Sequence, residues 1–365
     1  MITLRNLESR FPKRLVEPLT RSTLFATTGT GTRRIPVALV EGQTQNGDRS
    51  ASMLLAGHEP WCRYLPDRFF RDSPVFQPLG MFPVWRLREV IETHGAAADL
   101  TVIRIDQWSA RRWLCDSTFL AVPEWIGTRI YVPTDLGPLL RSGGSIKSDM
   151  RLVRQHGFEV SYDNDSEAVH YFYEHVYRPY VQTRYGVESY ARTEYDLQRR
   201  LRCGGMVWVL DRGRRVAGAL YERSGNEIAL LAIGTVDGDF SLVRQGAVAA
   251  LYYFVLQLAQ KLRCTTIDLR GCRPSLTDGV LLYKQKWGAV VCEKPETYYD
   301  LLVRWNRPSA IVRDFFTRCP LIFHEGGGLS ALTGDASEHA QSLRTEGIQS
   351  IYRLTENGPI LLANA

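Results

Sequence analysis

Apolar residues between positions 225 and 288 follow a pattern of strand, helix and strand. Residues 227–236 read as a buried strand, and a helix that is apolar almost all round begins near Gln245 and Gly246. A second apolar strand follows at residues 265–269. Strands without polar alternation are typical of a parallel pair covered on both faces. The pattern therefore predicts a buried parallel pair, joined by a helix whose N-terminus is a site for an anion.

The rest of the chain alternates between strand and helix patterns, which is the order of an α/β protein. Further strands are predicted at residues 35–40, 52–56, 99–105, 128–132 and 158–162, and hairpins at 206–210 with 216–221 and at 289–292 with 297–303. Helices are predicted at residues 84–94, 108–116, 145–156, 165–177, 194–201, 281–288 and 310–317. We expect an N-terminal arm at residues 1–34, an irregular cover at 61–83 and a polar tail at the end of the chain.

Proline and glycine residues cluster between positions 133 and 145, where a domain boundary is expected. A length of 365 residues suits two domains, or one duplicated domain. We predict a first domain at residues 1–140, a second at 141–307, and a C-terminal helix and tail at 308–365 that pack on the core.

The net charge of +6 comes mainly from arginines that are spread along the chain. One interpretation is an arginine-rich surface without a specific partner, because net charge bears on solubility and encounter rather than on fold. The other is an anionic ligand, such as a nucleotide, CoA, the phosphopantetheine of a carrier protein, or RNA. Charge alone does not choose between them.

Seven cysteines, an odd number with no Cys-x-x-Cys pair, argue against a disulfide framework and against a zinc site. The histidines show no metal-ligand spacing, so no metal is expected. The chain has no apolar run long enough to span a membrane, and its first residues lack the apolar core of a signal peptide. These features predict a cytoplasmic protein without a membrane span, and they leave its oligomeric state open.

Two further motifs accompany the apolar unit. Tyr283-Lys-Gln-Lys-Trp-Gly288 follows it, and a basic helix at residues 145–156 precedes Arg184-Tyr-Gly186. With the order of elements, these motifs resemble the Gcn5-related N-acetyltransferase (GNAT) fold over roughly residues 140–305. They are most similar to its FemAB-like or BioF2-like branch, whose members carry two such domains in tandem. The resemblance implies tandem GNAT-like domains, each with a mixed central sheet flanked by helices, with a degenerate N-terminal half and a better-conforming C-terminal half.

The resemblance also implies where a donor binds. In this fold the strand before the central helix supplies a backbone N–H to the acyl carbonyl, and the helix N-terminus holds the pyrophosphate. A parallel unit that binds no ligand has the same sequence pattern. The residues at the corresponding positions are Ile233, Thr235, Val236, Arg244, Gln245, Gly246 and Ala247.

The identity of the donor stays open on sequence. Members that use acyl-CoA usually carry Gln/Arg-x-x-Gly-x-Gly/Ala at the start of the central helix. Here Val243-Arg-Gln-Gly-Ala-Val-Ala249 keeps a basic residue and one glycine, but not the full spacing. Acyl-CoA, an acyl carrier protein and aminoacyl-tRNA therefore all remain candidate donors.

Four residues are candidates for the chemistry. Asp237 and Asp239 lie just past the carboxyl end of the strand, where open α/β sheets place ligands; each is either a general base or part of a solvated turn. The resemblance places Lys284 near the leaving group or phosphate of the donor, where its charge would stabilise negative charge. Tyr283 is a candidate to protonate the leaving group.

The remaining polar candidates concern substrate binding. Arg270, Arg273 and Asp278 form a polar loop suited to acceptor or donor phosphates. Arg184 and Tyr185 either line the acceptor side or are structural, with Arg184 in a salt bridge between helices and Tyr185 as an aromatic residue of the core. Asp268, inside a buried strand, needs a partner such as Arg270 or Arg273.

Together these features predict an N-acyltransferase that moves an acyl group from acyl-CoA or an acyl carrier protein to a primary amine on a small molecule or peptide, by direct attack in a ternary complex. One alternative is an aminoacyl transferase of FemAB type that uses aminoacyl-tRNA. Another is a binding module without catalysis.

Overall fold

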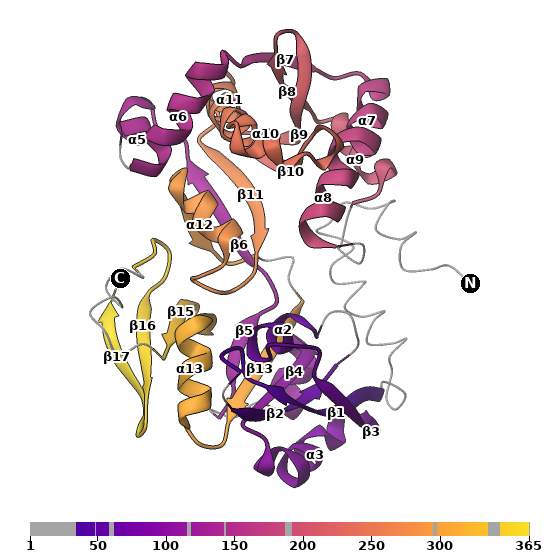
Figure 1. The fold of residues 1–365 in the computed structure, drawn as a ribbon, viewed down its shortest axis with the longest axis vertical. Coiled ribbons are helices and arrows are strands. Elements are labelled where there is room, and N and C mark those ends of the chain that lie inside the picture. Colours follow the sequence, from indigo (N-terminus) through magenta and orange to yellow (C-terminus); the bar gives the residue numbers. More distant parts are fainter. Residues whose placement is uncertain are drawn as a thin grey trace. The chain divides into compact units, whose positions relative to one another are not determined.

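Three β-sheets organise the chain, which divides into two units (Figure 1). We describe the protein from a computed structural model. The first unit comprises residues 1–121 and 298–315, and the second comprises 122–297 and 316–365, whereas the sequence prediction set its boundaries at 140 and 307. The structure describes residues 34–47, 49–57, 62–114, 118–141, 144–186, 192–294, 298–334 and 344–364. Nearly all of the predicted N-terminal arm, 1–33, lies outside the described residues.

The first unit is built on a six-stranded sheet. Its elements are β1 (Arg34–Gln43), β2 (Ser50–Ala56), α2 (Tyr64–Phe69), β3 (Val75–Pro83), α3 (Leu87–His94), β4 (Leu100–Asp106), α4 (Gln107–Trp113), β5 (Leu120–Pro123) and β13 (Tyr299–Trp305). The strand order is β3-β1-β2-β4-β13-β5, in which β2 and β4 are parallel. Apolar residues of the strands, α3 and α4 form the core on one face of this sheet.

The predicted irregular cover at residues 61–83 is wrong, because this segment contains α2 and β3. Its prolines suggest irregular structure, but β3 is an edge strand, which pairs on one side only. A proline is tolerated in such a strand because the missing N–H need not interrupt the ladder. Pro78 indeed lies in register with Ala38 of β1.

The second unit holds a seven-stranded sheet. Its elements are β6 (Ile126–Tyr131), α5 (Gly137–Arg141), α6 (Gly144–His156), β7 (Glu159–Asp163), α7 (Ser166–Phe172), a π-helix (Tyr173–Tyr177), α8 (Arg178–Tyr185), α9 (Glu194–Leu201), β8 (Gly204–Asp211), β9 (Arg214–Ser224), β10 (Glu227–Thr235), a 3₁₀ turn (Val236–Gly238), α10 (Phe240–Arg244), α11 (Ala247–Lys261), β11 (Thr266–Cys272), α12 (Gly279–Lys286) and β12 (Ala289–Cys292). The strand order is β12-β6-β11-β10-β9-β8-β7.

The predicted parallel pair is confirmed, since β10 and β11 run parallel in the middle of this sheet. The predicted hairpin of β8 and β9 is also confirmed. The second predicted hairpin is wrong: residues 289–292 form β12, which pairs with β6, whereas residues 299–305 form β13, which pairs with β4 in the other sheet. Two apolar runs close in sequence thus serve different sheets.

β10 and β11 separate along their length. They pair only at Glu227 with Thr266, Ile228 with Ile267, and Ala229 with Asp268. Beyond these positions β10 continues along β9, while β11 continues along β6. Over the described residues, the carboxyl halves of the parallel pair are therefore not joined to each other by ladder pairing.

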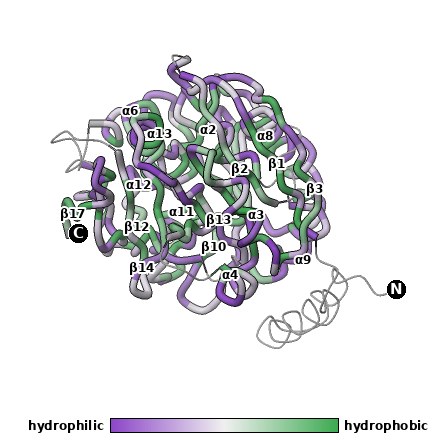
Figure 2. The backbone as a smooth tube through the Cα atoms, turned by 90° about the horizontal axis from the view of Figure 1, so that it is seen from below, coloured by the Kyte–Doolittle hydropathy of each residue, from purple (hydrophilic) through white to green (hydrophobic). Residues whose placement is uncertain are grey.

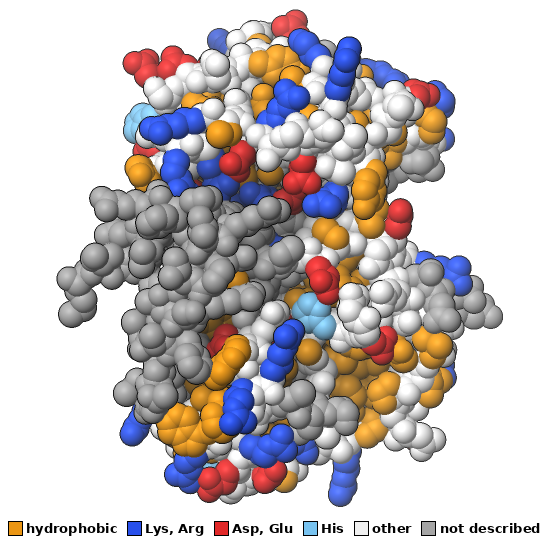
Figure 3. Space-filling model, turned by 180° about the vertical axis from the view of Figure 1, so that it is seen from behind, with side chains coloured by type: hydrophobic (Ala, Val, Ile, Leu, Met, Phe, Trp, Pro, Cys, Tyr) orange, Lys and Arg blue, Asp and Glu red, His pale blue; other side chains and the backbone are white. Residues whose placement is uncertain are grey.

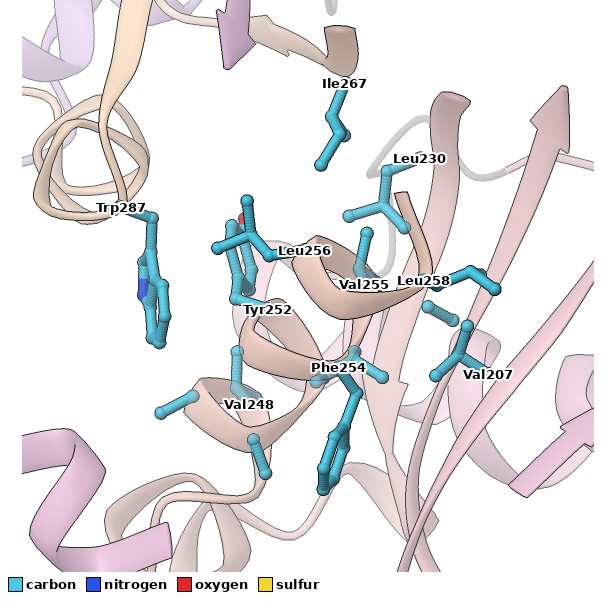
Figure 4. Close-up of a cluster of buried hydrophobic side chains, with 14 of the residues drawn as sticks. Val207, Leu230, Val248, Tyr252, Phe254, Val255, Leu256, Leu258, Ile267 and Trp287 are labelled. Carbon is cyan, nitrogen blue, oxygen red and sulfur yellow. The ribbon is translucent and has the colours of Figure 1, made fainter. Parts of the chain in front are cut away.

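α11 fills the centre of the second unit, as Figure 4 shows. Eleven of its fifteen residues are buried, in agreement with a helix that is apolar almost all round. Val255 and Leu256 are packed in the same cluster as Leu230 and Ile267 of the parallel pair. Each such side chain stabilises the fold by about 1.5–3 kcal/mol through removal of apolar surface from water.

The end of the chain forms a sheet rather than the predicted polar tail. After α13 (Ala310–Arg318) come β14 (Leu321–Glu325), β15 (Gly328–Thr333), β16 (Ser350–Thr355) and β17 (Gly358–Asn364), which are adjacent in this order. Ile322, Leu329 and Ile351 pack in one cluster with Ile126 and Leu281 of the second unit. The expectation of a polar tail is wrong because β14, β15 and β16 bury apolar residues in this cluster.

The strand orders and the flanking helices confirm a mixed α/β fold with mixed central sheets. In Figure 2 apolar segments alternate with short polar ones along the chain, as expected for buried elements joined by exposed turns. Among the described residues, no helix has the length and apolar character needed to cross a bilayer.

Candidate functional site

A bulge interrupts β10 where it leaves β11. Leu230 is in register with Tyr221 of β9 and Ala232 with Leu220, so that Leu231 is the extra residue. A bulge bends its strand and turns backbone groups out of the ladder. The irregularity therefore lies just before the positions, Ile233 to Val236, at which the sequence prediction places the donor carbonyl.

Gly234 lets helical backbone pack directly on β10. A Cβ atom at this position would lie 2.4 Å from the carbonyl oxygen of Val176 and 3.0 Å from Cβ of Tyr180. Val176 belongs to the π-helix, and Tyr180 to α8. Because π-helical turns are rare and occur frequently at functional sites, this contact marks the end of β10 as a candidate site.

The N-terminus of α11 is buried and has no side-chain cap. Gly246 precedes the helix with a φ of 97°, a left-handed conformation that suits glycine, and no side-chain cap is found among the described residues. Ala247, Val248 and Ala249 are buried. The first N–H groups of a helix have no partner within it, so a buried and uncapped end is a site for an anion.

The predicted donor residues lie at this helix end and at the end of the strand before it. Gly246 and Ala247 form the helix end, and half-buried Gln245 and exposed Arg244 precede it; Ile233 and Thr235 lie at the end of β10, and Val236 begins the 3₁₀ turn. Thr235 is buried, and its hydroxyl donates to the carbonyl oxygen of Asp239 at 3.0 Å. α10, which was not predicted from the sequence, lies between β10 and α11.

The two aspartates after β10 differ in their contacts. Asp239 caps α10: one oxygen accepts from the N–H of Ser241 at 2.7 Å, and the other from its hydroxyl at 2.8 Å. These hydrogen bonds lower the pKa of the Asp239 carboxyl. Asp237 has a left-handed φ of 52°, and its carboxylate lies 3.8 Å from Nδ1 of His175, with both side chains largely exposed. Of the two aspartates, Asp237 is therefore the one whose carboxylate is exposed and does not cap a helix.

Lys284 is buried, and its ammonium group is surrounded by backbone oxygens. Nζ donates to the carbonyl oxygens of Leu269 at 2.7 Å, Gly271 at 3.1 Å and Arg270 at 3.2 Å, and to the hydroxyl of Thr128 at 3.2 Å. The register of β11 against β6 shifts between Asp268 and Gly271. The ammonium therefore holds the backbone of β11 at its irregular stretch.

Tyr283 lies on the same helix, α12, in an aromatic cluster. Its ring is 5.3 Å from that of Tyr252 in an edge arrangement, and Nζ of Lys286 lies 5.4 Å from its centroid. Burial raises the pKa of the Tyr283 phenol; the negative charge of Asp149 raises it further, and the positive charge of Arg184 opposes this rise. Tyr283 therefore stays protonated at neutral pH.

Two residues near Tyr283 were not identified from the sequence. Asp149 of α6 forms an ion pair with Lys286 of α12, and both side chains are mostly buried. Tyr180 of α8 is buried and stacks on Phe240 at 6.0 Å between ring centroids. No sequence signal joins them, because they come from helices that are distant in sequence.

The predicted acceptor residues of α8 are partly described. Nη1 of Arg184 donates to the hydroxyl of Tyr180 at 2.6 Å, and the guanidinium is exposed to solvent. Arg184 thus contacts Tyr180, and its positive charge acts on the phenol of Tyr283. The side chain of Tyr185 lies outside the described residues.

The polar residues at the end of β11 and in the loop after it make contacts with neighbouring residues. Asp268 accepts from the N–H of Arg270 at 2.7 Å and from its guanidinium at 2.8 Å, which confirms the expected partner. The guanidinium carbon of Arg273 lies 4.0 Å from the ring centroid of Trp125. Asp278 is buried and caps α12 by accepting from the N–H groups of Val280 and Leu281. These contacts are structural.

Comparison with known proteins adds the following. No protein family model matches the chain, and no curated protein matches it. Among solved structures it is similar to FemX, with 14% identity over 82% of this chain and 96% of that one and a TM-score of 0.39. It is also similar to L-PGS from Bacillus licheniformis, with 12% identity over 74% of this chain and 85% of that one and a TM-score of 0.35. A GCN5-related N-acetyltransferase from Sphaerobacter thermophilus is similar with 12% identity over 70% of this chain and 72% of that one and a TM-score of 0.31. These likenesses do not decide the family. Any activity has to be inferred from the site.

Metal-binding groups do not gather in the part of the chain that the structure describes. No set of three or more His, Cys, Asp or Glu side chains there lies close enough to hold an ion. The six described cysteines are free thiols, and Cys115 lies outside the described residues.

Proposed function

We propose that the second unit catalyses N-acyl transfer, in which a primary amine attacks the carbonyl carbon of an acyl thioester or ester in a ternary complex. One observation carries the proposal. β10 and β11 separate beyond their three paired positions, and the helix that connects them, α11, begins at a buried N-terminus that no side chain of the described residues caps. The first feature offers backbone donors to a carbonyl oxygen, and the second offers an anion site, which are the two fixed groups that such a donor needs.

In this proposal the bulged half of β10 holds the acyl carbonyl. Backbone N–H groups between Leu231 and Val236 would donate to the oxygen as it gains negative charge. Donors fixed in advance stabilise such a transition state without reorganisation. The bulge at Leu231 and the close packing of Gly234 on the π-helix support this assignment, because both fix the strand.

The N-terminus of α11 would hold a phosphate of the donor. Arg244, Gln245, Gly246 and Ala247 surround it, and the helix dipole favours an anion there by about 0.3–1 kcal/mol, or up to about 2 kcal/mol when partly buried. Acyl-CoA and the phosphopantetheine of an acyl carrier protein both present a suitable phosphate. These are the donors that we propose.

The chemistry needs one base and one acid. As the C–N bond forms and the bond to the leaving group breaks, the amine gives up a proton and the leaving group takes one. Asp237 is the better candidate base of the two aspartates, since Asp239 is engaged as a helix cap and its pKa is lowered. Tyr283 is the candidate acid, because burial keeps its phenol protonated.

Other predicted residues have supporting roles in this proposal. Lys284 positions β11 rather than touching the donor, as its four oxygen partners indicate. Arg184, which contacts Tyr180, would bind the acceptor, and Tyr185 is proposed for the same role from sequence alone. Arg270, Arg273 and Asp278 would shape the neighbouring loop.

A thermal-shift panel tests the proposal. Acetyl-CoA, a long-chain acyl-CoA and an aminoacyl-tRNA are each added to the full chain, because a ligand that binds only the folded state stabilises it by about 2.7 kcal/mol at a hundred times its Kd. We expect an acyl-CoA to raise Tm. A rise with aminoacyl-tRNA alone would instead favour the FemAB-type alternative. No rise with any of them, and no acyl transfer to amines, would leave a binding module without catalysis.

A further inference from the structure

α6 presents a row of cations to solvent. Lys147, Arg151 and Arg154 are spaced i, i+4 and i+7, so they share one face of the helix, and all three are exposed. The row extends about 10 Å along the axis, from a rise of about 1.5 Å per residue. The opposite face, with Ile146, Met150 and Val153, is buried in the core of the second unit.

These cations have no counter-charge in the part of the chain that the structure describes. None of Lys147, Arg151 and Arg154 makes an ion pair there. The one acidic residue of α6, Asp149, is mostly buried and paired with Lys286. Over the face shown in Figure 3, Lys and Arg side chains are interspersed with Asp and Glu. The row is therefore an uncompensated charge rather than half of an internal network.

The row lies next to the proposed donor site. Leu152, between Arg151 and Arg154, has its Cβ 3.0 Å from where a Cβ of Gly246 would stand, at the start of α11. Figure 1 shows α6 alongside α11. Because Leu152 lies on a different side of α6 from the row, a partner on the exposed face would be separated from the α11 N-terminus by about the diameter of a helix, roughly 10–12 Å.

The chemistry of the row favours an acidic protein over a nucleic acid. Surfaces that bind single-stranded nucleic acid usually combine cations with exposed aromatic rings, but the exposed residues of the α6 face are only basic, serine and glutamine. The chain as a whole is mixed in charge, with 39 acidic residues against 45 basic ones, rather than strongly basic. Carboxylates at i, i+4 and i+7 of a partner helix would match the spacing.

We infer that the α6 face docks a small acidic helical protein that carries the acyl group on a phosphopantetheine arm. The inference rests on the proposed function and deepens it, since it selects the carrier-bound form of the donor. The cations would hold the carrier, and the arm would place its phosphate at the α11 N-terminus.

Binding measurements on matched variants test this. Isothermal titration with a purified holo-acyl carrier protein is done on the wild type, on K147A/R151A/R154A, and on R202A/R212A/R214A, which removes three exposed arginines outside α6. Alanine favours helix, so the α6 variant should fold. We expect the α6 variant to bind the carrier at least tenfold more weakly and the control within twofold of the wild type. Acetyl-CoA affinity should change less than twofold in both.

Three results would overturn the inference. The first is that both variants bind the carrier equally well or equally weakly, and the second is that the wild type does not bind the carrier; if acetyl-CoA still raises Tm, the proposed function survives and only the docking surface fails. The third is that a 20-nucleotide RNA, but not the carrier, binds the wild type and this binding is lost in the α6 variant, since the face would then recognise nucleic acid.

Discussion

Replacing Lys284 by methionine is expected to lower the free energy of unfolding by about 3 kcal/mol. Methionine keeps the length of the side chain but removes the ammonium from the carbonyl oxygens of Leu269 and Gly271. A buried acceptor left without a donor costs about 1–3 kcal/mol. Arg270 is less affected, because its carbonyl oxygen also accepts from the hydroxyl of Thr128 at 2.8 Å.

The measurement is urea unfolding followed by tryptophan fluorescence, with hydrogen exchange of the β11 amides as a local probe. Lys147→Met is the matched control, since Lys147 is exposed, and a change within about 0.5 kcal/mol is expected there. Should Lys284→Met retain its stability and lose acetyl-CoA binding instead, the ammonium would act on the donor directly. That outcome would support the role inferred from the family resemblance.

Gly234→Ala is expected to cost about 2–3 kcal/mol. The added methyl would lie 2.4 Å from a backbone oxygen, Val176 O, so the π-helix or β10 must move rather than a flexible side chain. Overpacking of a well-packed site typically costs about 1–3 kcal/mol, and displaced backbone puts the cost at the upper end. The displacement would also disturb the bulged half of β10, and donor binding should weaken with stability.

Gly279→Ala is the matched control for this substitution. Gly279 begins α12, and a Cβ there meets nothing within 4 Å. Alanine in place of an exposed helical glycine should be neutral or stabilising by up to about 1 kcal/mol. Thermal unfolding of the two variants makes the comparison. Equal stability of both would show that the close packing of Val176 on Gly234 is not a constraint.

The sequence was informative where apolar periodicity is continuous. The parallel pair and α11 could be predicted because a strand or helix that is buried on all sides has a continuous apolar sequence. Such a run can be found without knowing which elements pack against it. The bulge at Leu231 could not, since it depends on the register against β9. Strand register is set by pairing and packing rather than by local propensity.

The same limit applies to the candidate site. The burial of Lys284 depends on a partner 156 residues away, Thr128, and on carbonyl oxygens that carry no residue signature. The wrong hairpin at 289–303 has a related cause: neighbouring apolar runs usually pair, but β6 takes β12, and β4 takes β13. Helix caps were ambiguous too, because Asp239 and Asp278 follow the same pattern as catalytic aspartates near strand ends.

The central claim is that the N-terminus of α11 binds the phosphate of the donor. Gln245→Glu places a negative charge there without changing the shape of the side chain. At roughly 6 Å and an effective dielectric constant of about 20, the repulsion of a phosphate charge is about 2–3 kcal/mol. Gln257→Glu makes the same change at an exposed position further along the same helix, away from this end.

Isothermal titration of acetyl-CoA into the wild type and these two variants is the most direct test. We predict that Gln245→Glu weakens the affinity at least tenfold, while Gln257→Glu stays within twofold of the wild type and both variants remain as stable. Equal affinity of Gln245→Glu and the wild type, or no binding of acetyl-CoA to the wild type, would contradict a CoA phosphate site at the start of α11.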